Sequence, residues 1–177
     1  FVLFLGRMAA DKGADLAMEA ARRAMVPIVL AARCAGPAEM RYFDERIRPG
    51  LGAGATWLGE VDSHEKRDLL SRARCLLAPV RWDEPFGLVL IEALACGTPV
   101  VALRRGAVPE IVIDGTTGFV RSLPEELPEA ISRVDEIDPV AEATCDAGGL
   151  RRHRVVGRAG RDHGNGSLAR DGHIGRP

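Results

Sequence analysis

The chain has 177 residues, of which 46% are hydrophobic and 28% charged, and its formal net charge is −1. This length and hydrophobic content suffice for one domain with a buried core. The near-zero charge argues against a general binder of nucleic acids or anionic membranes, and no apolar stretch approaches the roughly 20 residues that direct membrane insertion of a spanning helix needs. The four widely spaced cysteines favour reduced thiols in a cytoplasmic protein over a disulfide framework or a zinc site.

Strands and helices alternate in the first part of the chain. Residues 1–5 form a continuous apolar run that ends at Gly6, as is typical of a strand buried on both faces. Asp11 is expected to cap the next helix, whose apolar positions recur at helical spacing. The predicted elements that follow are strands at 28–32 and 56–58 and a weaker helix at 38–51.

The same alternation continues in the second part of the chain. The predicted elements are a helix that begins at Ser63, strands at 75–78, 99–102 and 118–120, helices at 88–95 and 111–112, and a turn at Asp114-Gly115. This rhythm predicts an α/β fold, a Rossmann-like three-layer sandwich with a parallel sheet, over residues 1–143.

The composition changes near Cys145. Beyond it come eight Gly, seven Arg and three His, with no Lys and no aromatic residue, and the apolar residues follow no period. We expect residues 144–177 to form a disordered tail, and we favour a frameshifted or misread end of the gene. A nucleic-acid arm and a His-rich metal site are less favoured, because acidic residues interrupt the Arg and the His spacing fits no ligand pattern.

The segment Glu84-Pro85-Phe86-Gly87-Leu88-Val89-Leu90-Ile91-Glu92 carries the clearest chemistry. Pro85 disfavours a helix at Glu84 and Gly87 permits a sharp turn, so Glu84 is predicted on a loop that faces a helix N-terminus. Free N–H groups at that terminus attract phosphate, and carboxylates accept hydrogen bonds from sugar hydroxyls. Glu92 taken alone is more typical of a solvated surface residue.

The loop after the first strand is the second candidate. Gly6 permits a tight turn, and Arg7 and Lys12 place two cations at the carboxyl end of a strand, where open α/β sheets bind ligands. An Arg fork and a compact Lys charge suit a diphosphate. By itself the loop also fits two ordinary surface charges, and it is not a Walker loop.

Over about residues 1 to 135 the chain resembles the C-terminal, donor-binding domain of the retaining glycosyltransferases of family four, which have the GT-B fold of two Rossmann-like domains. The matching segments are Gly6-Arg7…Lys12-Gly13, Trp57-Leu58-Gly59-Glu60-Val61, Glu84 to Val89 followed by Glu92-Ala93-Leu94-Ala95-Cys96-Gly97-Thr98-Pro99-Val100, Gly106-Ala107-Val108-Pro109-Glu110, and Asp114-Gly115…Thr117-Gly118-Phe119. The segment from Glu84 to Glu92 is the most specific of these.

The resemblance implies transfer of a sugar from a nucleotide-diphosphate sugar with retention, without cofactor or metal, because cations of the protein replace the metal. Arg7 and Lys12 would hold the diphosphate and stabilise the leaving nucleotide. The other implied donor contacts are Glu84 to the transferred sugar, the backbone of Phe86, Gly87, Leu88 and Val89 to phosphate or sugar oxygens, Glu92 to the ribose, Val61 to the base, and Gly6 in the loop. Glu84 either attacks as a nucleophile or stabilises an oxocarbenium-like transition state; we favour the second role.

Two hypotheses of different classes remain open. Either the chain is the donor half of an enzyme whose acceptor binds through a missing N-terminal domain, or it is a binding module for nucleotides that transfers nothing by itself. A nucleotide-sugar epimerase or a phosphorylase fits less well, because the segment at Glu84 opposes the first and a pyridoxal-phosphate lysine site is not recognisable for the second. The sugar, the base, the acceptor and the oligomeric state are not indicated by the sequence.

Overall fold

A computed structural model describes residues 1–52 and 54–137 of the chain. These residues form one parallel sheet with the strand order β3-β2-β1-β4-β5-β6. The strands are β1 (Val2–Arg7), β2 (Ile28–Arg33), β3 (Ala55–Gly59), β4 (Cys75–Ala78), β5 (Val100–Leu103) and β6 (Gly118–Arg121). The helices are α1 (Ala14–Arg23), α2 (Pro37–Tyr42), α3 (Ser63–Arg72), α4 (Leu88–Ala95), α5 (Val108–Ile111) and α6 (Leu127–Ser132). The predicted tail at 144–177 lies outside the described residues.

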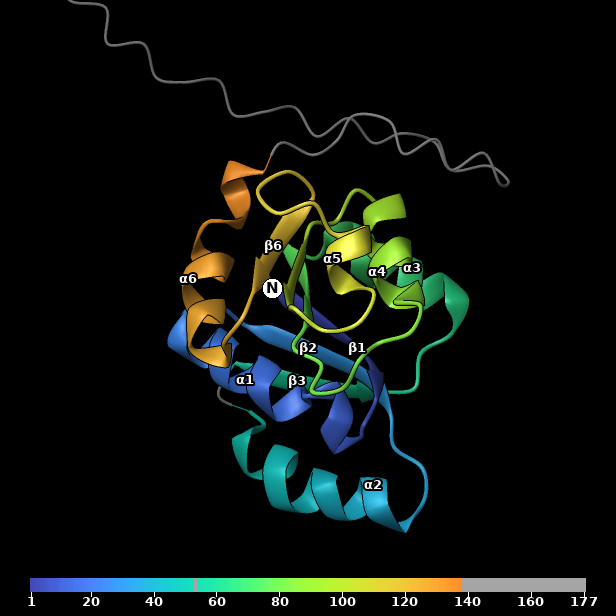
Figure 1. Ribbon diagram of the computed structural model, residues 1–177. Coiled ribbons are helices and arrows are strands. Elements are labelled where there is room, and N and C mark those ends of the chain that lie inside the picture. Colours follow the sequence, from blue (N-terminus) through green and yellow to red (C-terminus); the bar gives the residue numbers. More distant parts are fainter. Residues whose placement is uncertain (53, 138–177) are drawn as a thin grey trace, which may run out of the picture. The chain divides into compact units, whose positions relative to one another are not determined.

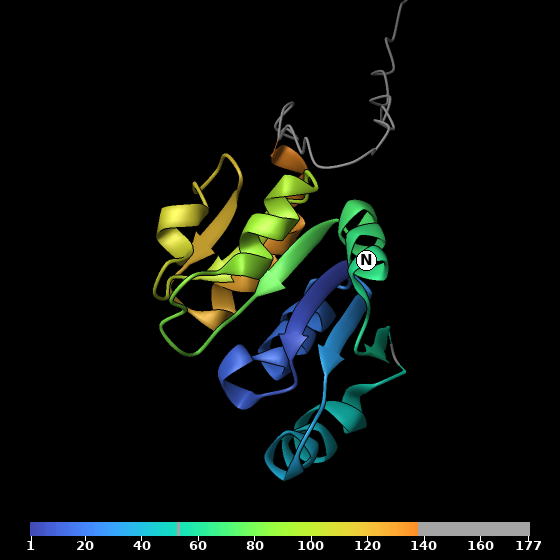
Figure 2. The same ribbon diagram turned by 90° about the vertical axis from the view of Figure 1, so that its right-hand side faces the viewer.

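Helices cover both faces of the sheet. Buried side chains of α1 and α6 pack on one face, whereas those of α3, α4 and α5 pack on the other. Figure 1 shows the two groups of helices on opposite sides of the strands, and Figure 2 shows α4 in front of the sheet with α6 behind it. The predicted α/β sandwich with a parallel sheet is confirmed.

The order of the strands creates a switch point in the middle of the sheet. From β1 the chain moves outward to β2 and β3, then returns to place β4 on the other side of β1. Both neighbours pair with β1 in parallel, so Val2 lies beside Ile28 on one side and Cys75 on the other. The loops that leave β1 and β4 therefore emerge side by side at one edge and diverge, which opens a crevice between them.

One local prediction was wrong and a second was only partly right. Asp11 does not cap α1, because it lies in a 3-10 helix (Ala10–Lys12) and Gly13, with a φ of 75°, is the N-cap residue. The helix predicted at 38–51 is confirmed in its extent, because residues 37–50 are helical without a gap, but it is not an α-helix throughout. It is divided into α2, a π-helical turn (Phe43–Ile47) and a 3-10 helix (Arg48–Gly50). Pro49 has no N–H to donate, so an α-helix cannot continue regularly through it.

Candidate functional site

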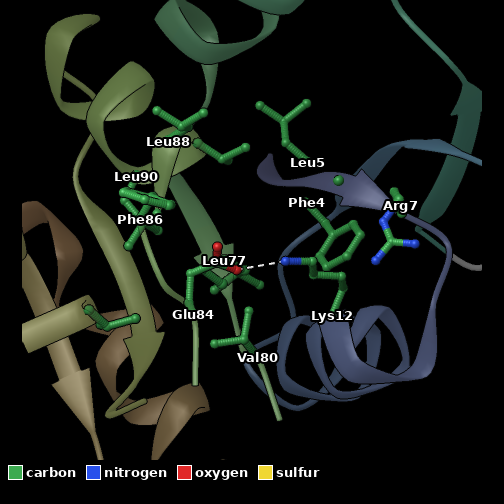
Figure 3. A pocket seen from close by; sticks show the side chains of 15 residues that line it. Phe4, Leu5, Arg7, Lys12, Leu77, Val80, Glu84, Phe86, Leu88 and Leu90 are labelled. Atoms are coloured by element: carbon green, nitrogen blue, oxygen red, sulfur yellow. Dashed lines mark hydrogen bonds and ion pairs between the residues drawn. The ribbon is translucent and has the colours of Figure 1, made fainter. Parts of the chain in front are cut away.

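A pocket of about 280 Å³ lies at the switch point of the sheet. Its walls come from the carboxyl ends of β1 and β4, the loops that follow them and the N-terminal turn of α4 (Figure 3). Its lining residues are Phe4, Leu5, Gly6, Arg7, Lys12, Leu77, Ala78, Val80, Glu84, Phe86, Gly87, Leu88, Val89, Leu90 and Val108. Apolar side chains form most of this wall, so the few charged groups act in a partly desolvated setting.

Most of the predicted site residues line this one pocket. Two loops and a helix start bring together Gly6, Arg7, Lys12, Glu84, Phe86, Gly87, Leu88 and Val89. Val61 and Glu92 are outside the lining. Val61 follows β3 and packs against the core on the α4 side of the sheet, while Glu92 lies in the second turn of α4.

The charged centre of the pocket is an ion pair between Lys12 and Glu84. Lys12 Nζ donates to Glu84 Oε2 over 2.6 Å, and the side chains are only 19% and 17% exposed. Trp82 contacts both partners, since its indole N–H donates to Glu84 Oε2 over 3.2 Å and Lys12 Nζ lies 4.5 Å from the ring centroid. Figure 3 shows the Lys12 side chain reaching across the pocket toward Glu84.

The surroundings of Glu84 favour its ionised form. Burial raises the pKa of this carboxyl, but the hydrogen bond and charge of Lys12, the Gly87 N–H and the Trp82 indole together hold it below the ordinary value. Glu84 is therefore an acceptor at neutral pH and does not donate a proton. A carboxylate of this kind can bind hydroxyl groups or stabilise a developing positive charge.

Two glycines allow the loops of the site to approach each other. A Cβ on Gly13 would lie 2.2 Å from the carbonyl oxygen of Pro79, so only glycine lets the start of α1 touch the loop after β4. A Cβ on Gly106 would lie 2.3 Å from the Glu84 carbonyl oxygen, and the Ala107 N–H donates to that oxygen over 2.7 Å. The backbone of Glu84 is thus fixed from the side of β5 as well.

The N-terminus of α4 faces the pocket. Gly87 is its N-cap residue in the left-handed region, with a φ of 61°, and the N–H groups of Leu88 and Val89 begin the helix. The first N–H groups of a helix have no partner within it, so they are donors available to an anion. Phe86 and Leu88 stay 73% and 69% exposed at the rim of the pocket.

Arg7 lies at the opposite wall and is held only loosely. Its side chain is 50% exposed, with Glu39 Oε1 at 3.4 Å and Asp11 Oδ2 at 3.9 Å. Exposed ion pairs with such long distances contribute little free energy to the folded state. The guanidinium of Arg7 can therefore turn toward a bound anion with little loss of stability.

Glu92 has a partner that the sequence did not suggest. Lys66 of α3 donates to Glu92 Oε1 over 2.5 Å, and the two side chains are 29% and 40% exposed. The pair joins α3 to α4 beside the pocket. One carboxylate oxygen accepts a hydrogen bond from Lys66, and among the described residues none donates to the other.

Within residues 1–52 and 54–137, no group of three or more His, Cys, Asp or Glu side chains is arranged to hold a metal ion. In the same residues no helix has the length and apolar character needed to cross a membrane.

Comparison with known proteins identifies the family to which this fold and site belong. The family model described as "Glycosyl transferases group 1" matches residues 1–136, which include every residue of the pocket. The chain belongs to this family. The family and its GT-B architecture agree with the resemblance seen in the sequence.

Three relatives illustrate the match. Alpha-maltose-1-phosphate synthase of Mycolicibacterium smegmatis is 33% identical over 165 residues, which are 89% of this chain and 42% of the relative. D-inositol 3-phosphate glycosyltransferase of Mycobacterium bovis is 39% identical over 130 residues, 68% of this chain and 26% of the relative. Anabaena HepE in complex with UDP and glucose is 28% identical, with a TM-score of 0.66 over 76% of this chain and 38% of HepE. The chain thus spans less than half the length of these relatives.

Several groups that shape the pocket were not found from the sequence. Trp82, Lys66 and Asp15 received no role, and Gly106 appeared only in a segment that resembles the family. An aromatic residue two positions before a loop carboxylate, and a glycine after the next strand, are signals too general to assign contacts across 20 or more residues.

Proposed function

We propose that the pocket binds a nucleotide-diphosphate sugar, and that the chain is the donor-binding domain of a glycosyltransferase that acts with retention of anomeric configuration. The observation that carries this proposal is the Lys12–Glu84 ion pair inside a pocket at the switch point of the sheet. One cation for a diphosphate and one carboxylate for sugar hydroxyls lie within a single hydrogen bond of each other. A sugar phosphate ester needs the same adjacency of binding groups.

Arg7, Lys12 and the N-terminus of α4 would share the diphosphate. Lys12 supplies a compact charge and Arg7 a planar fork, while the N–H groups of Leu88 and Val89 supply neutral donors. As the bond to the sugar breaks, negative charge grows on the leaving nucleotide, and these fixed donors stabilise it. In this proposal the protein's own cations do the work that a metal ion does in other nucleotide enzymes, and no cofactor is required.

Glu84 would bind the transferred sugar beside the anomeric carbon. Its lowered pKa keeps it ionised, which suits stabilisation of an oxocarbenium-like transition state. If Lys12 holds the departing phosphate, its ion pair with Glu84 would put this carboxylate on the same face as the leaving group. That position favours stabilisation on the front face over nucleophilic attack from behind.

The nucleoside would extend from the pocket toward α3 and β3. Glu92 would accept a hydrogen bond from a ribose hydroxyl through Oε2, because Lys66 donates to Oε1. Val61 would contact the base. The structure of HepE in complex with UDP and glucose supports a uridine nucleotide as the first donor to test. The acceptor would bind through a second domain of a longer polypeptide, acting in the cytoplasm.

Isothermal titration calorimetry on this chain tests donor binding. UDP, ADP, GDP and UDP-glucose are titrated separately, with uridine as the control that lacks phosphate. We expect saturable heat for at least one nucleoside diphosphate and weaker binding of uridine. Heat from none of them at millimolar concentration would contradict the proposal.

Transfer and retention require a polypeptide that joins this domain to an acceptor-binding domain. The anomeric coupling constant of the first product, followed by proton NMR, is expected to match that of the α-linked donor. In the same polypeptide Glu84→Ala should lower turnover far more than it lowers nucleotide affinity. An inverted product would contradict the retaining mechanism but leave donor binding standing.

A further inference from the structure

Arg81 and Asp15 form a two-pronged ion pair beside the pocket, and neither lines it. Arg81 Nη1 donates to Asp15 Oδ1 over 2.7 Å, and Arg81 Nη2 donates to Asp15 Oδ2 over 2.8 Å. Asp15 lies in the first turn of α1, three positions after Lys12, and Arg81 lies three positions before Glu84. The pair therefore connects the two loops that carry the charged centre of the site. Paired N–H···O bonds fix direction as well as distance.

The Asp15 carboxylate is held from more than one side. Tyr42 Oη donates to Asp15 Oδ1 over 2.7 Å and accepts from the Asp15 N–H over 3.0 Å, and Arg46 Nη2 lies 3.6 Å from Oδ2. Partial burial raises the pKa of Asp15, but Arg81 and Tyr42 outweigh it and lower that pKa to about 2. The carboxylate is therefore charged at neutral pH.

Arg81 also binds the turn that precedes Lys12. Its Nη1 donates to the Ala10 carbonyl oxygen over 2.7 Å, and its backbone N–H donates to the Asp11 carbonyl oxygen over 2.8 Å. One residue of the Glu84 loop thus contacts the chain on both sides of Lys12. The Lys12–Glu84 pair could not hold the loops in this way, because Lys12 has a flexible stem and reaches Glu84 through one hydrogen bond.

We propose that Arg81 and Asp15 are positioning residues that hold the loop of Lys12 against the loop of Glu84, and so set the spacing between the diphosphate and sugar subsites. This inference rests on the proposed function and deepens it. Placement errors of about 1 Å at a reacting centre cost on the order of 100-fold in rate, so a rigid link between these loops has a direct consequence for transfer.

An ion pair that merely stabilises the fold would behave differently. Its loss would lower the free energy of unfolding and weaken every ligand of the site to the same extent. The loss of a positioning pair has a selective effect. It weakens the binding of ligands that contact both loops, and it changes interactions that cross from one loop to the other, such as that of Lys12 with Glu84. The two roles are therefore separable by comparing ligands and by observing Glu84 itself.

The first measurement compares UDP with uridine by calorimetry in Asp15→Ala and Arg81→Lys, each checked for folding by circular dichroism. Arg81→Lys keeps the charge and removes the fork. We expect UDP affinity to fall about tenfold in Asp15→Ala and less in Arg81→Lys, with uridine affinity changed by less than about twofold. Glu19→Ala is the matched control, because Glu19 is exposed, pairs with Arg22 on the same helix and does not line the pocket. Equal losses for UDP and uridine would overturn the proposal.

The second measurement needs no nucleotide. The pKa of the Glu84 carboxyl is followed by carbon-13 NMR in the wild type and in Asp15→Ala. Removal of a negative charge lowers a neighbouring carboxyl pKa through space, whereas loss of the Lys12 contact raises it. We expect a rise, and a fall or no change would overturn the positioning role. If the wild type binds no nucleotide, the proposed function fails, and this pKa still decides the inference.

Discussion

Lys12 and Glu84 are 72 positions apart in the sequence, yet their side chains meet over 2.6 Å in the middle of the pocket. One comes from the loop after β1 and the other from the loop after β4, which are neighbours because the chain reverses its direction of winding between them. Without ligand, each charge neutralises the other. A bound nucleotide-diphosphate sugar would give each side chain a new partner, since its phosphate oxygens would bind Lys12 and its sugar hydroxyls would bind Glu84.

Lys12→Ala is expected to weaken UDP binding more than uridine binding. The variant removes one charge-assisted contact, which is worth about 1.5–3 kcal/mol, or roughly 10- to 100-fold in affinity. Titration calorimetry with the two ligands measures the difference. Arg72→Ala is the control, since Arg72 pairs with Asp68 on the exposed side of α3. Equal losses for both ligands in Lys12→Ala would rule out a diphosphate role for Lys12.

Gly106→Ala is expected to unfold more easily than Gly97→Ala. Both glycines have positive φ, 50° and 73°, so both substitutions carry the left-handed strain of about 1–2 kcal/mol. Only at Gly106 would the Cβ also meet the Glu84 backbone, at 2.3 and 2.4 Å, whereas Gly97 has open space. The clash adds about 1–3 kcal/mol.

Urea unfolding of the two glycine variants measures that difference in the free energy of unfolding. Gly106→Ala should also bind UDP-glucose more weakly than Gly97→Ala does, because the backbone of Glu84 has to move. Identical unfolding curves would mean that Glu84 is not supported by Gly106.

Glu92→Ala is expected to reduce the affinity for UDP but to leave the affinity for 2′,3′-dideoxy-UDP unchanged. The contact that the variant loses is a hydrogen bond from a ribose hydroxyl to a carboxylate. In the wild type, the binding free energies of the two nucleotides should therefore differ by roughly 1.5–3 kcal/mol. Lys66→Ala should show a smaller effect in the same direction, since Lys66 orients Glu92 from α3. A variant that loses the same affinity for both nucleotides would place Glu92 away from the ribose.

The Asp15 carboxyl is expected to make stability pH-dependent in the acid range. Burial raises its pKa, but Arg81 and Tyr42 lower it from 3.8 to about 2, so the folded state binds this proton less readily than the unfolded state. The resulting stability is complete above the unfolded pKa of 3.8 and is lost as the pH falls toward about 2. Allowing for its partial exposure, we expect about 1–2 kcal/mol.

Urea unfolding at about pH 5 and about pH 2 measures this contribution as the difference between wild type and Asp15→Asn. Other carboxyls titrate in both proteins and cancel in that comparison. A variant whose stability falls with pH as steeply as that of the wild type would show that Asp15 does not carry the shift.

The sequence was sufficient for the architecture and for most of the pocket. Apolar runs and turn residues placed every strand, because buried parallel strands have a strong local pattern. Helix 88–95 was predicted with the bounds that the structure has. The motif at Glu84 and the cations at Arg7 and Lys12 fall in one pocket, since both loops follow strands that meet at the switch point.

Contacts between distant segments could not be predicted in the same way. The link from Arg81 to Asp15 spans 66 positions and depends on the strand order, which periodicity does not encode. Asp11 looked like a helix cap by residue type, but the close approach of Gly13 to Pro79 decides where α1 begins. Helix α6 has only six residues and a Pro near its start, and its pattern was too short to assign.

The most direct test of the central claim is a titration of the isotope-labelled chain with UDP and then UDP-glucose, followed by amide and side-chain NMR. We expect UDP to shift the amides of Gly6, Leu88 and Val89 and the Lys12 side chain, and UDP-glucose to shift the Glu84 carboxyl in addition. Shifts confined to other parts of the chain, or none at millimolar UDP, would contradict a donor site at this pocket.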